Sequence, residues 1–328
     1  MIFVIPQSMP RFPRLLQTGG PFLGLLLVCA LFALTEERQF IFTGGNLKNI
    51  LTQTVIVAIG ALGMTLIIVG GGIDLSVGSV VAFCGVLGAK LLVAGWSPWA
   101  TTLVLVAAGC GIGLVNGAIV AGFRMMPFIV TLGMMGIVRG AAKWLGNNQT
   151  INAPQDSPVG GLMARVNPGG FWPLPWGVWI VLGLALVMAV LLRRTVLGRH
   201  VFAVGSNETA SRYSGVRVGW VKLSTYAIAG LLFGFAGLLQ MSRLTQGDPT
   251  VAIGLELDII AAVVIGGASL NGGAGSILGS MIGALIMALL RNGTNQLGWQ
   301  TFTQEIIIGV VIVLAVGLDR WRQARGGR

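Results

Sequence analysis

Two aspartates stand in otherwise apolar sequence and are the first side chains to consider for chemistry. Asp74 lies in GGGIDLSVGS and Asp258 lies in GLELDIIAAVVIGG, and each leads into an apolar run. The free amides and the dipole of a helix N-terminus favour an anion at such a position. Each aspartate is therefore either a structural helix cap or a polar group on a pathway for a solute, and the sequence leaves both interpretations open.

Neutral polar side chains lie near breaks in the apolar runs. They are Ser76, Ser79, Asn116, Thr131, Ser269 and Asn271. Hydroxyl and amide groups offer many neutral hydrogen bonds, which suits a polyol such as a sugar better than a permeant ion. The alternative is that each of these groups satisfies the backbone of a neighbouring helix.

The sequence contains no recognisable motif for catalysis, metal binding or cofactor binding. There is no Gly-x-Ser-x-Gly elbow, no His-Glu-x-x-His and no phosphate-binding Gly-x-x-x-x-Gly-Lys-Ser/Thr loop. The single histidine, His200, has no partner cluster, and the three cysteines all lie inside apolar runs. We therefore expect no catalytic residue, no metal and no cofactor, and any ATP that drives transport must be hydrolysed by another chain.

Composition indicates that lipid is the solvent for most of the surface. Of the 328 residues, 55% are hydrophobic and 9% are charged, and the mean hydropathy is +0.86. Soluble domains carry roughly 25% charged residues. The net charge of +11 does not indicate nucleic-acid binding, because the cations lie between apolar runs and at the C-terminus, where they set membrane orientation.

The apolar runs predict an all-α polytopic membrane protein, since a bilayer-crossing helix needs roughly 20 mainly apolar residues. We expect about ten spans, at 19–34, 50–70, 73–93, 101–121, 127–145, 176–192, 223–241, 257–270, 275–291 and 304–319. The excess of Lys and Arg between alternate spans then places both termini in the cytoplasm. The domain organisation is a cytoplasmic tail over 1–18, a transmembrane permease domain over 19–319 and a basic cytoplasmic tail over 320–328.

Two polar segments interrupt the spans. Residues 146–175, rich in Pro, Gly, Asn and Trp, are expected outside the membrane as a lid, a docking surface or a plain connecting loop. Residues 193–222 form the largest cytoplasmic loop. Within it Asn207 can cap a short helix over 208–214 and Gly215 can end that helix. This helix is either a handle for a cytoplasmic partner or an ordinary loop helix.

Small residues recur at four-residue spacing, which places them on one helix face and permits close backbone approach. The ridges are Gly109/Gly113/Gly117, Gly230/Gly234 and Gly275/Gly279/Gly283. They predict a tight bundle but no particular chemistry. The predicted topology also puts Asp74 on the inner side and Asp258 on the outer side, which is the pattern that an inverted internal repeat would produce.

Several strings carry a family resemblance over residues 46–319. They are NLKNILTQT, GMTLIIVGGGIDLSVGS, PFIVTLGMMGIVRG, LGRHVFAVGSNETASRYSGV, GLELDIIAAVVIGGASLNGGAGSILGSMIGAL and IIIGVVIVLAVGLDR. In these the chain resembles the ribose-type permeases of bacterial ABC importers, within the wider group that includes branched-chain amino acid permeases. The resemblance implies a type II ABC importer-like permease in the bacterial inner membrane.

Partners and site residues also follow from the resemblance. It implies a second permease subunit, as a homodimer or heterodimer, with the pathway at their interface. It also implies a cytoplasmic ABC ATPase subunit and a periplasmic or extracellular sugar-binding protein. The coupling element would fall over Gly205–Gly215, with Asn207, Glu208, Arg212 and Ser214 touching the ATPase.

Three alternatives remain beside a monosaccharide importer. A branched-chain amino acid permease would share the fold. An ion-coupled secondary transporter would usually carry several ionisable residues at mid-membrane, and this chain has few. A membrane-embedded enzyme would need a nucleophile and base, and no such set is present in the sequence.

Overall fold

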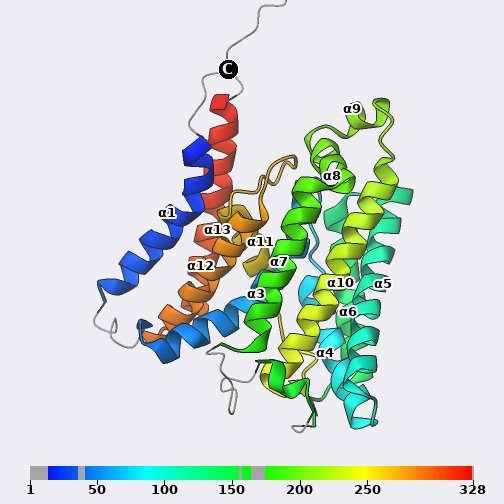
Figure 1. The fold of residues 1–328 in the computed structure, drawn as a ribbon, viewed down its shortest axis with the longest axis vertical. Coiled ribbons are helices and arrows are strands. Elements are labelled where there is room, and N and C mark those ends of the chain that lie inside the picture. Colours follow the sequence, from blue (N-terminus) through cyan, green and yellow to red (C-terminus); the bar gives the residue numbers. More distant parts are fainter. Residues whose placement is uncertain (1–13, 36–40, 155–156, 164–173, 327–328) are drawn as a thin grey trace, which may run out of the picture.

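The structure, a computed structural model, describes residues 14–35, 41–154, 157–163 and 174–326. These residues form a bundle of helices (Figure 1). The helices are α1 Arg14–Ala33, α3 Gly44–Val69, α4 Val77–Val93, α5 Pro98–Gly122, α6 Pro127–Leu145, α7 Trp176–Arg194, α8 Val196–Ser206, α9 Glu208–Tyr213, α10 Val218–Leu244, α11 Leu255–Ile265, α12 Ile277–Gln296 and α13 Thr301–Gly326. The short elements are β1 Ile151–Asn152, η1 Gly160–Met163 and β2 Gln246–Gly247.

The helices confirm a polytopic membrane protein but revise the expected spans. Six of the described helices are long and apolar enough to cross a membrane, namely α3, α5, α6, α7, α10 and α12. Shorter apolar helices cover Gly19–Ala33, Val77–Val93 and Thr301–Val311. The span expected at 257–270 is instead the 11-residue α11. It ends because Gly266 and Gly267 follow, and Gly267 has a φ of +90° that no helix tolerates.

Local sequence explains where the long helices begin. Ser97 accepts a hydrogen bond from the Ala100 amide at 3.2 Å, and Pro98 occupies the first turn of α5. Pro127 likewise starts α6. The helix α13 continues through Gly326, so part of the tail expected over 320–328 extends this helix.

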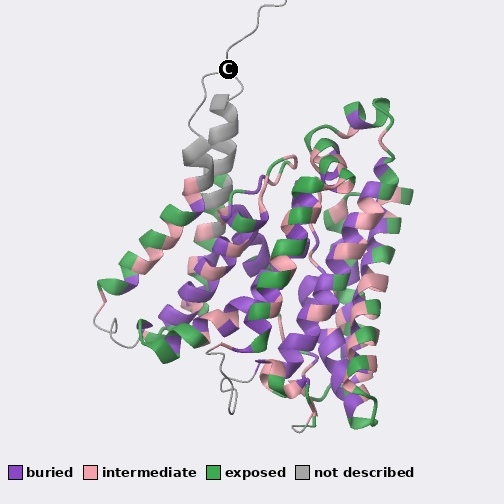
Figure 2. Cartoon of the chain, in the orientation of Figure 1, coloured by how far each residue is buried: buried purple, intermediate pink, exposed green. Residues whose placement is uncertain are grey.

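The central helix is α3, and the outer helices expose many apolar side chains. In the most apolar 18-residue stretch of α3, 94% of the residues are buried. In the same kind of stretch of α6 and of α7, 28% of the residues are buried. Figure 2 shows this contrast as a buried interior and an exposed rim. The exposed apolar side chains of the rim therefore fit a lipid or subunit contact rather than water.

Helix packing repeats across the two halves of the chain. Helix α5 packs on α10 as α12 packs on α3, and α4 packs on α6 and α10 as α11 packs on α13 and α3. The glycine ridges let α5 approach α10 closely and let α12 approach α11 closely. A Cβ on Gly113 would meet the Tyr226 carbonyl of α10, and a Cβ on Gly283 would meet the Ala262 carbonyl of α11. The two halves are thus built alike, as an inverted repeat requires.

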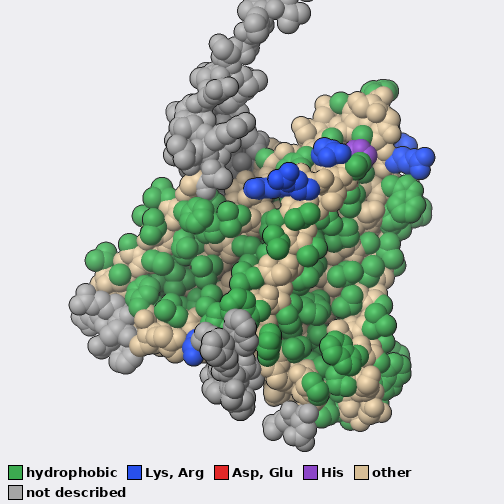
Figure 3. All heavy atoms as spheres, viewed as in Figure 1, with side chains coloured by type: hydrophobic (Ala, Val, Ile, Leu, Met, Phe, Trp, Pro, Cys, Tyr) green, Lys and Arg blue, Asp and Glu red, His purple; other side chains and the backbone are tan. Residues whose placement is uncertain are grey.

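The start of α1, the end of α13 and the helices α8 and α9 lie at the same end of the bundle, at the top of Figure 1. Figure 3 shows that Lys and Arg side chains gather at this end, beside α8 and α9. The exposed cations there include Arg193, Arg194 and Arg199.

At the opposite end, the described part of the 146–175 segment is fixed to the second half of the chain. Ile151 and Asn152 of β1 pair antiparallel with Gln246 and Gly247 of β2. The Ser242 hydroxyl of α10 donates to the Val159 carbonyl at 2.6 Å and accepts from the Met163 amide at 3.1 Å. These residues form an ordered cover over the end of α10.

Candidate functional site

Asp74 lies at the centre of a buried hydrogen-bonded cluster between α3 and α4. Its side chain is 1% exposed. One carboxylate oxygen accepts from the Ser76 amide at 2.8 Å and from the Ser76 hydroxyl at 2.6 Å. The other faces the Asn116 amide nitrogen of α5 at 3.4 Å. The carboxylate therefore fixes the turn that precedes α4, and none of the described cations pairs with it.

Neighbouring helices supply the rest of the Asp74 cluster. The Thr131 hydroxyl of α6 accepts from the Leu75 amide at 3.1 Å. The Tyr226 hydroxyl of α10 lies 3.4 Å from the Ile73 carbonyl. Ser79 is fully buried, and its hydroxyl has no hydrogen-bond partner in the described part of the chain. The structure thus brings Asp74, Ser76, Asn116 and Thr131 together, with Ser79 one turn further along α4.

Asp258 has a different environment in the first turns of α11. One carboxylate oxygen lies 2.7 Å from Nε and 2.7 Å from Nη2 of Arg291 on α12. The other oxygen is buried and has no hydrogen-bond donor among the described residues. The Gly254 amide, which begins the helix, lies 3.3 Å from Glu256 rather than from Asp258. Asp258 is therefore not the cap of α11.

Asp258 and Arg291 line a cavity of about 380 Å³. Its walls come from α3, α10, α11 and α12 and from the connection between α10 and α11. The polar lining residues are Gln53, Gln240, Arg243, Asp258, Arg291 and Asn295. Along α10, Tyr226 of the Asp74 cluster and Gln240 of the cavity are 14 residues apart, about 21 Å. The two aspartates therefore serve separate sites.

The connection between α10 and α11 forms one wall of the cavity and is held in place from α6. Arg139 donates to the Pro249 carbonyl at 2.9 Å and to the Val251 carbonyl at 2.7 Å. Val251 and Ala252 line the cavity. Because β2 belongs to the same connection, the strand pair with β1 links this wall to the 146–175 segment.

The starts of α4 and α11 meet between the two aspartate sites. A Cβ on Gly78 would lie 2.6 Å from a carboxylate oxygen of Glu256 and would also meet the Ala252 carbonyl. Both helices follow a chain segment that breaks the regular helical path. Discontinuous helices that meet in this way are typical of transporters, in which they surround the solute site.

Ser269 and Asn271 do not join either aspartate site. They lie in the connection between α11 and α12, where the Ser269 hydroxyl accepts from the Asn271 amide at 3.2 Å. Asn271 is exposed. In the same connection, the Gly273 amide donates to the carbonyl of Val69 at the end of α3, at 2.8 Å. Gly205 of α8 packs against this hydrogen bond, because a Cβ on Gly205 would meet both the amide nitrogen and the carbonyl oxygen.

The short helix expected over 208–214 is present as α9, and its role as a handle for a cytoplasmic partner stays a prediction. The Asn207 side chain accepts from the Ala210 amide at 2.8 Å, and Gly215 follows the helix with a φ of +83°. Ser214 donates its hydroxyl hydrogen to the Ala210 carbonyl at 3.0 Å. Tyr213 is 88% exposed, so the helix presents a large aromatic side chain to its surroundings.

Glu208 ties the handle to α10. Its carboxylate lies 2.7 Å from Lys222 and 2.9 Å from Arg212. The hydrogen bond from Lys222 lowers the pKa of Glu208, with smaller contributions from the charges of Lys222 and Arg212. Glu208 is thus an anchor of the handle, and Gly205 is a packing residue against the bundle.

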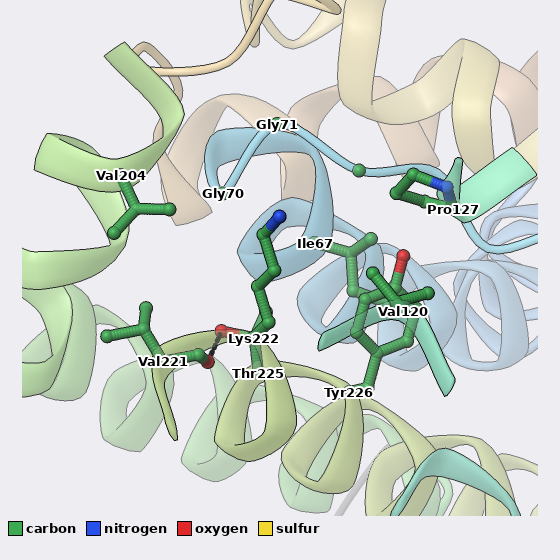
Figure 4. Close-up of a pocket in the computed structure, with 11 residues that line it drawn as sticks. Ile67, Gly70, Gly71, Val120, Pro127, Val204, Val221, Lys222, Thr225 and Tyr226 are labelled. Carbon is green, nitrogen blue, oxygen red and sulfur yellow. Dashed lines mark hydrogen bonds between the residues drawn. The ribbon is translucent and has the colours of Figure 1, made fainter. Parts of the chain in front are cut away.

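Lys222 also lines a small cavity next to the Asp74 cluster. The cavity measures about 20 Å³, enough for about one water molecule. Figure 4 shows the Lys222 amine directed toward Gly70 and Gly71, with Tyr226 on the same helix. Helix α10 therefore contacts the handle through Lys222 and the turn before Asp74 through Tyr226.

Sequence reasoning missed the polar partners that come from distant helices. Arg291, Gln53, Gln240 and Asn295 complete the Asp258 site, and Lys222 and Tyr226 connect the handle with the Asp74 turn. One feature of the sequence could have pointed to these partners, because charged and amide side chains are rare inside the apolar runs. An ionisable residue inside a transmembrane segment is a functional candidate with a partner to be found.

Comparison with known proteins identifies relatives over almost the whole chain. A sequence model of the family described as branched-chain amino acid transport system / permease component matches residues 46–316. The chain is 42% identical over 300 residues to the ribose import permease protein RbsC of Escherichia coli (strain K12), covering 91% of this chain and 92% of the relative.

Two further relatives are similar over a comparable length. The ribose import permease protein RbsC of Bacillus subtilis (strain 168) is 37% identical over 323 residues, which is 97% of each chain. The L-arabinose ABC transporter permease protein AraH of Azospirillum brasilense is 35% identical over 312 residues, covering 94% of this chain and 89% of the relative.

Proposed function

The chain belongs to the family of branched-chain amino acid transport system permease components, and from this premise we propose how it works as the permease subunit of an ABC importer. It carries a monosaccharide across the membrane. The observation that carries this substrate class is the identity of 35% to 42% to permeases named for ribose and L-arabinose, over at least 91% of the chain.

ATP is hydrolysed by a partner ATPase, and this chain receives the motion through α9. Asn207, Arg212, Ser214 and Gly215 lie on the exposed side of the handle and, with Tyr213, form the contact surface for the ATPase. Tyr and Arg are the residues that most often dominate such contacts. Glu208 and Gly205 have different roles, since one anchors α9 to α10 and the other packs α8 on the bundle.

The handle acts on the interior through two routes. Lys222 links Glu208 to α10, and one turn later Tyr226 contacts the Ile73 carbonyl beside Asp74. Gly205 of α8 packs on Val69, where α3 ends, and on Gly273, in the connection between α11 and α12. A rotation of the handle would therefore shift the starts of α4 and α12 together. Such a two-state movement converts closure of the ATPase pair into inward-open and outward-open forms.

Membrane orientation follows from the distribution of cations. The end that carries α8 and α9 also carries Arg193, Arg194 and Arg199, so this end faces the cytoplasm of a bacterial inner membrane. The beginning of α1 and the end of α13 lie at the same end, in agreement with two cytoplasmic termini. The 146–175 segment then faces outward, where a sugar-binding protein would dock, and the exposed apolar rim contacts lipid and a second permease subunit.

The decisive experiment is uptake into proteoliposomes. The permease is reconstituted with its ATPase and its binding protein, and labelled D-ribose, L-arabinose, D-allose and L-leucine are supplied outside with ATP inside. We expect uptake of one of the sugars that requires all three components. Uptake of leucine alone would favour the amino acid alternative, and uptake driven by an ion gradient without the ATPase would overturn the proposed mechanism.

A further inference from the structure

We propose that the cavity at Asp258 is a binding site for a neutral monosaccharide. The proposal rests on the proposed function and adds to it a specific place where the solute pauses after leaving the binding protein. The site is the cavity of about 380 Å³ whose polar lining residues are Gln53, Gln240, Arg243, Asp258, Arg291 and Asn295. This volume lies in the range of roughly 300–1,000 Å³ found for small-molecule sites.

The first argument is a hydrogen-bonding capacity that the protein itself leaves unused. Asp258 is 3% exposed, and only one of its carboxylate oxygens is engaged by Arg291. The other oxygen has no donor among the residues that the structure describes. A buried carboxylate oxygen without a donor is costly, so it calls for a hydroxyl group that enters with a ligand or with water.

The second argument is the mixture of groups around this oxygen. Gln53 on α3, Gln240 on α10 and Asn295 on α12 line the same cavity and can both donate and accept hydrogen bonds. Ile56, Val57 and Ala288 provide apolar wall between them. A sugar ring presents hydroxyl groups at its edge and C–H groups on its faces, so it matches a lining of this kind.

Location also fits a solute site. The cavity lies toward the end of the bundle opposite to the handle. The distribution of cations makes this the outward end. One wall of the cavity is the α10–α11 connection. That wall is tied to the 146–175 segment through the pairing of β1 with β2. A protein that docks on the outward segment can therefore move a wall of the site, which would couple delivery of the sugar to its entry.

The test is direct binding to the permease alone, without ATPase or binding protein. Full-length permease in lipid nanodiscs is titrated with ¹³C-labelled D-ribose, L-arabinose and D-allose, and binding is followed by saturation-transfer NMR. We expect one of the sugars that the complex transports to bind. Gln53→Leu and Asp258→Asn should each weaken this binding about tenfold, the effect of losing one hydrogen bond to a buried polar group.

The matched control is Gln149→Leu, the same change in the exposed 146–175 segment, which should bind the sugar like the parent protein. Asp258→Asn also disturbs the ion pair and could unfold the protein, so Gln53→Leu decides in that case. Absence of binding, or equal binding by Gln53→Leu and the parent, would overturn the cavity site even if the complete complex imports the sugar. Binding of L-leucine in place of a sugar, with the same dependence on Gln53, would overturn both the ligand class and the proposed substrate.

Discussion

Asp74 and Asp258 carry the same sequence signal and occupy opposite kinds of site. The Asp74 carboxylate is enclosed by the Ser76 amide, the Ser76 hydroxyl and the Asn116 side chain, all from the protein itself. The Asp258 carboxylate is shared between Arg291 and a cavity, with one oxygen left without a donor among the described residues. An aspartate before an apolar helix therefore does not reveal its role. The role depends on whether the protein supplies hydrogen-bond donors to both carboxylate oxygens or to only one of them.

The two regions also differ in what they contact. The Asp74 region touches the handle through Tyr226 and Lys222, whereas the Asp258 region touches the outward 146–175 segment through β2. One region is therefore placed to receive motion, and the other is placed to receive solute. Four substitutions test this division, from the largest expected effect to the smallest.

Arg291→Ala should have the largest effect, because it leaves the Asp258 carboxylate buried without its cation. We expect the free energy of unfolding to fall by about 3 kcal/mol. This is the low end of the range for removing one partner of a buried ion pair, because about a third of the Arg291 side chain is solvent-exposed. The measurement is the thermal unfolding midpoint in detergent. The double variant Asp258→Asn/Arg291→Gln should recover most of the loss. If it were as unstable as Arg291→Ala, the charge imbalance would not be the cause.

Asp74→Ala should cost about 2 kcal/mol, since the Ser76 amide and hydroxyl lose a buried acceptor together. Asp74→Asn keeps an acceptor oxygen at the same place and should unfold within about 1 kcal/mol of the parent. Thermal unfolding and uptake are measured for both. A structural role for Asp74 predicts that Asp74→Asn still transports, and loss of uptake by a stable Asp74→Asn would show that the charge itself is needed.

Gly215→Val should weaken attachment of the ATPase. Gly215 has a φ of +83° and no atom within 4 Å of an added Cβ, so the cost is conformational only, about 1–2 kcal/mol. Gly95→Val is the matched control, because Gly95 has a φ of +82° and equally open surroundings at the other end of the bundle. We expect less ATPase to co-purify with Gly215→Val than with Gly95→Val. Equal co-purification would remove α9 from the interface.

Lys222→Gln should have the smallest effect on stability, within about 1 kcal/mol, because Glu208 is 40% exposed and solvent screens the pair. Its effect should appear in coupling, as more ATP hydrolysed per sugar imported. Sugar binding at the Asp258 cavity should be unchanged. Arg199→Gln, which removes an exposed cation of α8, is the control. Normal coupling in Lys222→Gln would argue against the link between handle and Asp74.

The glycine ridges show how far spacing alone can lead. The four-residue spacing of Gly109, Gly113 and Gly117 predicts a face for close packing, and the structure confirms it. That this face packs against the Gly230/Gly234 ridge could not be predicted, because spacing describes one helix at a time. The choice of α10 as the partner of α5 depends on the fit of whole surfaces.

The sequence by itself determined the features that depend on residues adjacent in the chain. Apolar length predicted the membrane helices, and the Asn207 cap with Gly215 predicted α9, because each depends on residues adjacent in the chain. The tertiary structure alone decided that Glu208 reaches Lys222 and that Arg291 meets Asp258. These contacts join residues that are 14 and 33 positions apart, and a long side chain finds such a partner only when helix packing has fixed which faces meet.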